Sequence, residues 1–223
     1  MNNYQKEQDK SIKIIRNAYR KYGRGLFVLS SFGADAGMLL SLVKKTGLRI
    51  PVITIDTGFL FPETHLYKHT LKNKFDMRVI TYGPYKDEVE QIAFDRLWEK
   101  DIDAYHHMVK VEPLKRAVEE LGVEALLQGV RADQTEARAN LSVVEEGQFG
   151  EDRVHPLLEW KKPQVEKYQS DENVPRNLLF YEGYESIGDW TTTMPGFGRS
   201  GRRLGLTNGC GLVIGEGGKL VSA

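Results

Sequence analysis

Short apolar runs alternate with segments of helical periodicity between Leu26 and Gly129, and this alternation constrains the fold more than any other feature. The apolar runs cover residues 26–29, 51–55, 78–82 and 124–129. Short runs of this kind, bounded by turn residues, are typical of strands buried on both faces of a parallel sheet. We therefore predict an α/β fold, Rossmann-like, with a mostly parallel sheet and helices on both faces.

Helices are expected before and between these runs. Apolar residues recur at helical spacing over residues 11–22, and Gly23 ends that segment. Further helices are predicted from residue 36 to Gly47, from Pro62 onwards, over residues 89–97, and from Pro113 to residue 121. The sequence thus predicts a repeating strand and helix order.

The pattern loosens after residue 140, where glycines and prolines divide the chain into short pieces. From residue 183 to the end, 11 of 41 residues are glycine. We predict a nucleotide-binding α/β domain over residues 1–182 and a Gly- and Arg-rich, loop-rich tail over residues 183–223 that carries Cys210.

Composition excludes several classes of partner. The chain has 31 Lys and Arg and 31 Asp and Glu, so no net charge attracts it to nucleic acid or to an anionic membrane. No apolar run approaches the roughly 20 residues of a membrane span, and the first residues lack the apolar core of a secretory signal. We expect a cytoplasmic protein.

The single cysteine, Cys210, excludes an internal disulfide and any metal site built from several thiolates. His106 and His107 are adjacent, so their side chains point apart and do not easily share a metal ion. Surface or core positions are expected for both histidines.

The loop Ser30-Ser31-Phe32-Gly33 joins the first predicted strand to the helix that follows. Ligands of parallel sheets bind at the carboxyl ends of the strands, and the amide groups at a helix N-terminus bind phosphate. The two hydroxyls add donors. The alternative is an ordinary N-cap at a strand-to-helix turn. The loop matches neither the phosphate-binding lysine loop of nucleoside triphosphatases nor the G-x-G-x-x-G of dinucleotide sites.

The triplet Asp56-Thr57-Gly58 ends the second predicted strand. Aspartic proteases carry a similar triplet, but they need two carboxylates that share a proton in a β fold. A loop that contacts a ribose or a base is therefore favoured.

Arginines gather in two later segments of this neutral chain, at Arg131 and Arg138 and at Arg199, Arg202 and Arg203. No aromatic residues interleave with them as in a nucleic-acid surface, so a bound phosphate or sulfate is the favoured partner, against a solvated face.

Cys210 lies between Gly209 and Gly211, shortly after the second group of arginines. Positive charge near an accessible thiol favours the nucleophilic thiolate. An inert, buried cysteine is the alternative.

In this order along the chain, the segments resemble the phosphoadenylyl-sulfate reductases, thiol enzymes of assimilatory sulfate reduction in the adenine nucleotide α-hydrolase-like superfamily. The resemblance runs from about Gly25 to Leu212. It rests on eight segments in register, namely Ser30-Ser31-Phe32-Gly33, residues 55–64, Lys110-Val111-Glu112-Pro113, Gly129-Val130-Arg131, Ala137-Arg138-Ala139-Asn140, Glu182-Gly183-Tyr184, Ser186-Ile187-Gly188-Asp189 and Cys210-Gly211-Leu212.

The resemblance implies a role for each candidate residue. Ser30, Ser31, Phe32 and Gly33 would hold the phosphosulfate of 3′-phosphoadenylyl sulfate, and Asp56, Thr57 and Gly58 would border the adenosine. Lys110, Arg131, Arg138 and Arg202 would line the anionic pocket. Cys210 would be the nucleophile, with thioredoxin or glutaredoxin as reductant and sulfite and adenosine 3′,5′-bisphosphate as products. We also expect a homodimer.

Reductases of adenylyl sulfate that carry an iron-sulfur cluster have a Cys-Cys pair before the K-[VI]-E-P segment and a C-x-x-C after S-I-G. The corresponding places here read His106-His107-Met108-Val109 and Asp189-Trp190-Thr191-Thr192, so no iron-sulfur cluster or other cofactor is expected. The family usually has Lys and Glu before the cysteine and Gly-Leu-His after it. This chain has Asn208 and Gly209 before Cys210 and Val213 in the histidine place. A cluster-free adenylyl-sulfate reductase and a nucleotide-binding homologue without turnover are the alternatives.

Overall fold

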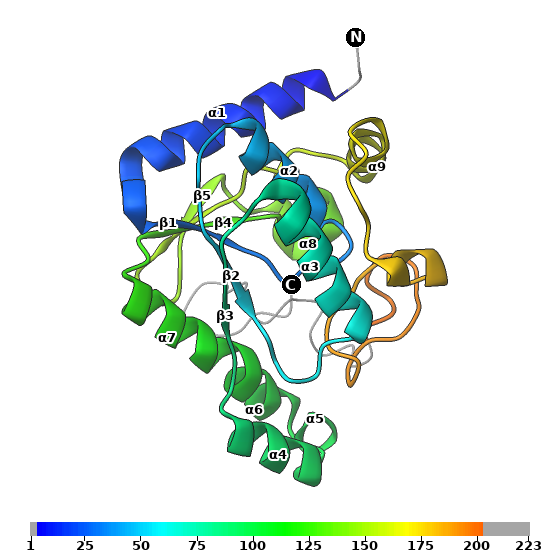
Figure 1. Cartoon of the computed structure of the whole chain (residues 1–223). Coiled ribbons are helices and arrows are strands. Elements are labelled where there is room, and N and C mark those ends of the chain that lie inside the picture. The colour runs from blue at the N-terminus through cyan, green and yellow to red at the C-terminus, as the bar shows by residue number, and fades with distance from the viewer. Residues whose placement is uncertain (1–3, 203–223) are drawn as a thin grey trace.

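A six-stranded sheet forms the centre of the computed structural model, which describes residues 4–202 (Figure 1). The strands lie in the order β3-β2-β1-β4-β6-β5. Their bounds are Leu26–Leu29 for β1, Val52–Ile55 for β2, Val79–Tyr82 for β3, Ala125–Gln128 for β4, Val144–Glu146 for β5 and Asp152–Val154 for β6. The first five strands of this order pair in parallel, and β5 pairs antiparallel with β6 at one edge.

The long helices are α1 (Gln5–Tyr22), α2 (Ala36–Lys45), α3 (Pro62–Phe75), α4 (Lys86–Asp95), α7 (Glu112–Leu121) and α9 (Lys162–Asp171). The shorter helical pieces are η1 (Gly23–Gly25), α5 (Leu97–Lys100), α6 (Ile102–His106), η2 (His107–Val111), η3 (Ala132–Gln134), α8 (Glu136–Ala139) and η4 (Leu178–Glu182).

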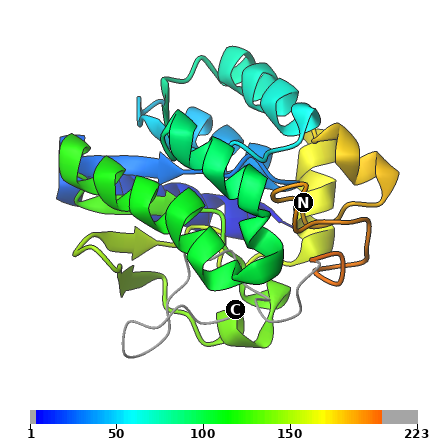
Figure 2. The same cartoon turned by 90° about the horizontal axis from the view of Figure 1, so that it is seen from below.

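Helices cover both faces of the sheet because alternate residues of each strand point to opposite sides. Leu26 and Val28 of β1 pack with residues of α1, α2, α3 and α9 in the larger core cluster. Phe27 and Leu29 pack on the other face against Leu114, which belongs to α7. Figure 2 shows the green α7 in front of the blue strands. All four residues of β1 are buried, as expected for a strand covered on both faces.

The predicted α/β fold and its parallel sheet are confirmed, but three helices differ from the prediction, two of them between residues 86 and 121. The helix expected over residues 89–97 ends at Asp95, because Arg96 has a φ of 49° and breaks the helical hydrogen bonding before α5. The helix expected to start at Pro113 continues from α6 through η2, a single π-helical turn. Pro113 follows this π-helical turn as the second residue of α7.

The chain after residue 140 holds more regular structure than its pattern indicates. It contains β5, β6 and α9, and β6 extends the parallel sheet beside β4.

The first helix begins earlier than predicted, at Gln5 rather than residue 11.

The segment from Gly183 to Arg202 lies against the carboxyl edge of the sheet. Ile187 is buried with Ala34 and Leu179, and Asp189 forms an isolated antiparallel bridge with Leu60. The division into a domain over residues 1–182 and a tail from residue 183 stays a prediction. Among residues 4–202, no helix is both long and apolar enough to cross a membrane.

Gly83 provides a test of how tightly the carboxyl ends of β2 and β3 pack. A Cβ at Gly83 would lie 2.2 Å from the backbone oxygen of Asp56. Since only a backbone shift relieves this clash, Gly83→Ala should lower the free energy of unfolding by roughly 1–3 kcal/mol in urea titrations.

Gly129→Ala is the matched control, because a Cβ there would meet its nearest atoms at 3.9 Å. It should change stability by less than about 0.5 kcal/mol. Equal stability of the Gly83→Ala variant and the unmodified chain would contradict the packing described here.

Candidate active site

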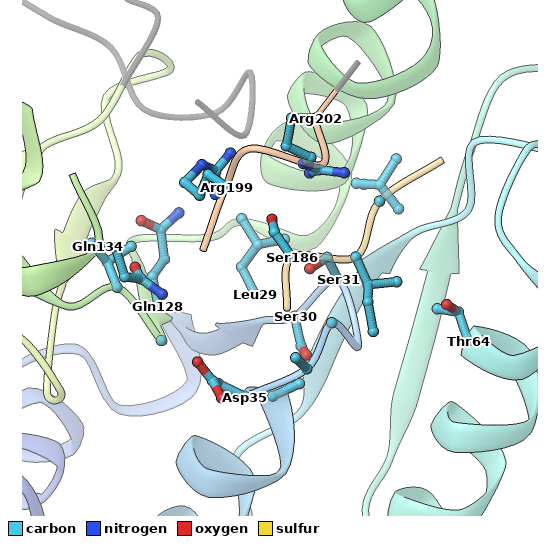
Figure 3. Close-up of a pocket in the computed structure, with 18 of the residues that line it drawn as sticks. Leu29, Ser30, Ser31, Asp35, Thr64, Gln128, Gln134, Ser186, Arg199 and Arg202 are labelled. Carbon is cyan, nitrogen blue, oxygen red and sulfur yellow. The ribbon is translucent and has the colours of Figure 1, made fainter. Parts of the chain in front are cut away.

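A pocket opens at the carboxyl edge of the parallel sheet, where several of the predicted site residues meet (Figure 3). Its walls come from the ends of β1, β2 and β4, from the start of α2, and from the segment 185–202. The predicted residues that line it are Ser30, Ser31, Gly33, Thr57, Lys110, Arg138 and Arg202. The predicted residues Phe32, Asp56, Gly58 and Arg131 are not among its lining.

The loop after β1 presents hydroxyls and a helix N-terminus to this pocket. Ser30 and Ser31 lie at the centre of the view in Figure 3, and Gly33 also lines the pocket. Phe32 turns its side chain into the core, 1% exposed, with a φ of 50°. Its backbone N–H donates to Ser30 Oγ at 3.2 Å. The loop can therefore offer phosphate its hydroxyls and the positive end of α2.

The triplet after β2 contributes one residue to the pocket. Thr57 is buried, and its Oγ1 donates to Asp189 Oδ1 at 2.7 Å. Asp56 instead accepts the N–H of Gly58 at 3.2 Å and lies 3.8 Å from Lys68 Nζ. Gly58 has a φ of 79°, which suits a residue without a Cβ in this turn.

Asp189 joins three separate segments at the wall of the pocket. The carboxylate is fully buried, and its Oδ2 lies 2.6 Å from Lys110 Nζ. Burial raises the pKa of Asp189, but the Lys110 ammonium, the Thr57 hydroxyl and Arg202 outweigh it and hold that pKa below its usual value. A buried charge is stable only when it is paired in this way.

His106 and Tyr105 lie next to this ion pair. Burial, Lys110 and Arg202 lower the pKa of His106 to about 3, against Asp189, which raises it. The ring is therefore neutral at physiological pH. The Tyr105 hydroxyl lies 3.0 Å from Thr191 Oγ1. His107 is exposed, so the adjacent histidines point apart as predicted.

The predicted arginines occupy two environments. Arg138 and Arg202 line the pocket, where Arg138 donates to Gln134 and Arg202 donates to Thr193 Oγ1 at 2.7 Å. The buried Arg131 guanidinium is held by Asp35 and by Asp133 Oδ1, the latter at 2.9 Å. Arg131 thus neutralises the carboxylate at the start of α2 rather than facing the pocket.

The lining includes four cationic side chains and three carboxylates, those of Asp35, Glu185 and Asp189. Each carboxylate has an ion-pair partner, which is Arg131, Lys162 and Lys110 respectively. The negative charges of these side chains are thus neutralised by their ion-pair partners, and the pocket suits an anion.

Several residues of the pocket were not selected from the sequence, namely Asp35, Gln128, Gln134, Glu185, Ser186 and Asp189, whereas Arg199 belongs to the arginine cluster for which an anion was expected. Ser186 and Asp189 belong to a segment that carries the family resemblance, and this signal could have identified them. Gln128 lies inside a predicted strand, residues 124–129, and nothing in the neighbouring sequence distinguished it from the other strand residues.

Cys210 and Arg203 lie outside the described residues, so the predicted role of Cys210 stays a prediction. Within residues 4–202, no group of three or more His, Cys, Asp and Glu side chains is placed to hold a metal ion.

Removal of one partner of the buried Lys110–Asp189 pair should lower stability strongly, because it leaves the other charge without its counter-charge. Asp189→Asn leaves Lys110 14% exposed without its counter-charge, so it should cost about 3 kcal/mol in urea unfolding. The double variant Lys110→Met with Asp189→Leu should be more stable than Asp189→Asn, because it leaves no buried charge. Glu185→Gln, which breaks the more exposed pair with Lys162, should cost less than about 1 kcal/mol. A double variant less stable than Asp189→Asn would contradict this description.

The neutral His106 makes stability depend on pH. The unfolded chain binds a proton on this residue near pH 6.5, whereas the folded chain does so near pH 3. The unfolded state therefore binds more protons in this window, and stability should fall as the pH decreases from about 6.5 towards 3. When the pH decreases from 7.5 to 5.5, the free energy of unfolding of His106→Gln in urea titrations should fall by about 1 kcal/mol less than that of the unmodified chain. Parallel pH profiles of the two proteins would show that His106 is not buried in its neutral form.

Comparison with known proteins relates this geometry to a family. The family model described as the phosphoadenosine phosphosulfate reductase domain matches residues 25–195. A phosphoadenosine 5′-phosphosulfate reductase of Synechococcus sp. is 35% identical over 224 residues, which cover 95% of each chain. One from Buchnera aphidicola is 36% identical over 193 residues, 82% of this chain and 78% of the relative.

Solved structures of other proteins are similar to this chain over most of its length. The phosphoadenylyl-sulfate (PAPS) reductase of Candida auris, in a phosphate complex, superposes with a TM-score of 0.74 at 33% identity, over 83% of this chain and 90% of that one. Candida glabrata FMN adenylyltransferase, 16% identical, has a TM-score of 0.66 over 86% of this chain and 63% of that one, and it shares the fold. The chain therefore belongs to the phosphoadenosine phosphosulfate reductase family.

Proposed function

We propose that this chain reduces 3′-phosphoadenylyl sulfate to sulfite and adenosine 3′,5′-bisphosphate, as in assimilatory sulfate reduction. The observation that carries the proposal is the match to the reductase family over residues 25–195, together with the pocket that the matched residues build. Ser30, Ser31 and the N-terminus of α2 face the same space as Arg138 and Arg202. This arrangement suits a ligand with several phosphate and sulfate oxygens.

The proposed chemistry requires one thiolate on the protein and two electrons from a partner. The Cys210 thiolate attacks the sulfur of the phosphosulfate, the sulfur–oxygen bond to the nucleotide phosphate breaks, and adenosine 3′,5′-bisphosphate leaves. The product on the protein is S-sulfocysteine. A thiolate of thioredoxin or glutaredoxin then attacks Cys210 Sγ and releases sulfite. The second thiol of that partner then attacks the mixed disulfide between the partner and Cys210. The Cys210 thiolate is released, and the partner is oxidised to an internal disulfide.

The neutralised carboxylates of the pocket support this assignment. A substrate that develops negative charge on its leaving phosphate is stabilised by nearby cations. Asp35 and Asp189 are paired with Arg131 and Lys110, and Arg138, Arg199 and Arg202 also line the pocket, so cationic side chains outnumber carboxylates among the described residues that line it.

The same proposal assigns no cofactor to the reaction. An iron-sulfur cluster needs several cysteine ligands, and the whole chain has one cysteine. Because the second thiol comes from a partner kept reduced in the cytoplasm, we place the reaction there. We also propose that two copies of this chain form a homodimer.

Mass spectrometry tests the nucleophile directly. After incubation with 3′-phosphoadenylyl sulfate and no reductant, the chain should carry a sulfonate on Cys210, and Cys210→Ser should carry none. With thioredoxin and its reductase present, the unmodified chain should release sulfite, and Cys210→Ser should lose essentially all of this activity. Sulfite release at the normal rate from Cys210→Ser would refute the mechanism.

The residues around Cys210 favour two other candidates, because Asn208, Gly209 and Val213 replace residues that the family usually carries there. Higher kcat/KM on adenylyl sulfate than on the 3′-phosphorylated nucleotide would identify a cluster-free adenylyl-sulfate reductase. Nucleotide binding in calorimetry without any sulfonate on Cys210 would identify a binding protein without turnover.

A further inference from the structure

Gln128 and His155 meet at the carboxyl edge of the sheet, beside the pocket. Gln128 is the last residue of β4 and lines the pocket, and His155 directly follows β6. Leu127 pairs in register with Val154, so Gln128 and His155 occupy the next pair of positions. Both side chains are buried, and His155 Nε2 lies 3.3 Å from the nearer end of the Gln128 amide, at the Oε1 position.

The other ring nitrogen shows where the imidazole proton must lie. His155 Nδ1 is 3.0 Å from the backbone carbonyl oxygen of Ser142. A carbonyl oxygen only accepts hydrogen bonds, so Nδ1 has to carry a hydrogen. The neutral tautomer with its hydrogen on Nε2 would place two lone pairs against each other at this distance.

A second proton on the ring is disfavoured by its surroundings. Burial lowers the pKa of His155, and Arg153 and Arg138 lower it further, against the Ser142 carbonyl and Glu145, which raise it. The net direction is downwards. The ring is therefore neutral at physiological pH, and Nε2 presents a lone pair to Gln128.

A buried lone pair requires a donor, and the Gln128 amide has one. The oxygen and NH₂ ends of a primary amide have nearly the same shape, so hydrogen-bonding partners decide which end faces a neighbour. We infer that Gln128 donates its NH₂ to His155 Nε2 and turns its carbonyl oxygen towards the pocket, where it accepts a hydrogen bond from the nucleoside part of the ligand.

The surroundings of Gln128 indicate which part of a nucleotide it contacts. Leu29 pairs in register with Gln128, and Leu29 and Ile55 both line the pocket. Apolar side chains suit a base or a ribose, and a carbonyl oxygen repels phosphate oxygens. The expected partner is a hydroxyl or an amino group, which on adenosine 3′,5′-bisphosphate means the ribose 2′-hydroxyl or the adenine amine. The identity of this ligand rests on the proposed function, whereas the orientation of the amide does not.

Nuclear magnetic resonance of the full chain with ¹⁵N-labelled histidine tests the orientation without any variant. At neutral pH, His155 should show a protonated Nδ1 and an unprotonated Nε2. A hydrogen on Nε2, in either the neutral or the charged ring, would overturn the inference.

Calorimetry tests the ligand contact with three nucleotides. These are adenosine 3′,5′-bisphosphate, its 2′-deoxy analogue and the analogue that lacks the adenine amine. The unmodified chain should bind one of the two analogues about fivefold more weakly than the parent, which corresponds to one neutral hydrogen bond. Gln128→Leu should reduce this ratio to about one, and the analogue that shows the effect identifies the group.

Gln134→Leu is the matched control, because Gln134 also lines the pocket but its oxygen already accepts from the Arg131 backbone N–H, at 3.1 Å, and from Arg138. The affinity of Gln134→Leu for all three nucleotides should fall, while the ratio of the affinity for the parent to that for each analogue should stay as in the unmodified chain. An unchanged ratio in Gln128→Leu would overturn the ligand contact. Failure of all three nucleotides to bind would instead refute the proposed function, and the histidine spectrum would still test the amide.

Discussion

The parallel pairing of β1 with β2 on one side and β4 on the other is the constraint on which the rest of the structure depends. Because three neighbouring strands run in the same direction, their carboxyl ends meet at one edge. The strands are short, with four residues each, and helices cover both faces. The polar side chains that follow each strand are thereby brought together, although they are far apart in the sequence.

Charge pairing organises what this edge can bind. Asp35 directly precedes α2, and Asp189 belongs to the segment that crosses the edge. Each carboxylate would oppose an anionic ligand if it were unpaired. Arg131 and Lys110 neutralise them. Lys110 is consequently the counter-ion of Asp189. The same ion pair and the Thr57 hydroxyl connect the loop after β2, the π-helical turn η2 and the segment 185–202.

Much of the fold was predictable from residue patterns. The strands β1 to β4 are apolar runs between turn residues, and the loop predicted to bind phosphate, residues 30–33, follows the first of them. The strands β5 and β6 were missed because they have three residues each and carry charged side chains such as Glu145 and Asp152. The break at Arg96 was missed because a left-handed residue other than glycine leaves no signal in apolar periodicity.

The site was predictable in outline for the same reason, since its loops follow the predicted strands. The environments of its charged side chains were not predictable. Arg131 and Arg138 look equivalent in the sequence, yet the former pairs with Asp35 and Asp133, and the latter lines the pocket. Asp189 contacts Lys110 and Thr57, and Gln128 contacts His155, although these partners lie many residues away in the sequence. Such pairings arise from the tertiary fold and leave no local pattern.

A crystal structure of the full chain with adenosine 3′,5′-bisphosphate tests the central claim most directly, namely that the carboxyl edge of the sheet holds a nucleotide. We expect a phosphate against Ser30, Ser31 and the start of α2, with the nucleoside beside Leu29 and Gln128. A nucleotide bound away from this pocket, or one placed with its phosphates against Leu29 and its base at the Ser30 loop, would contradict it.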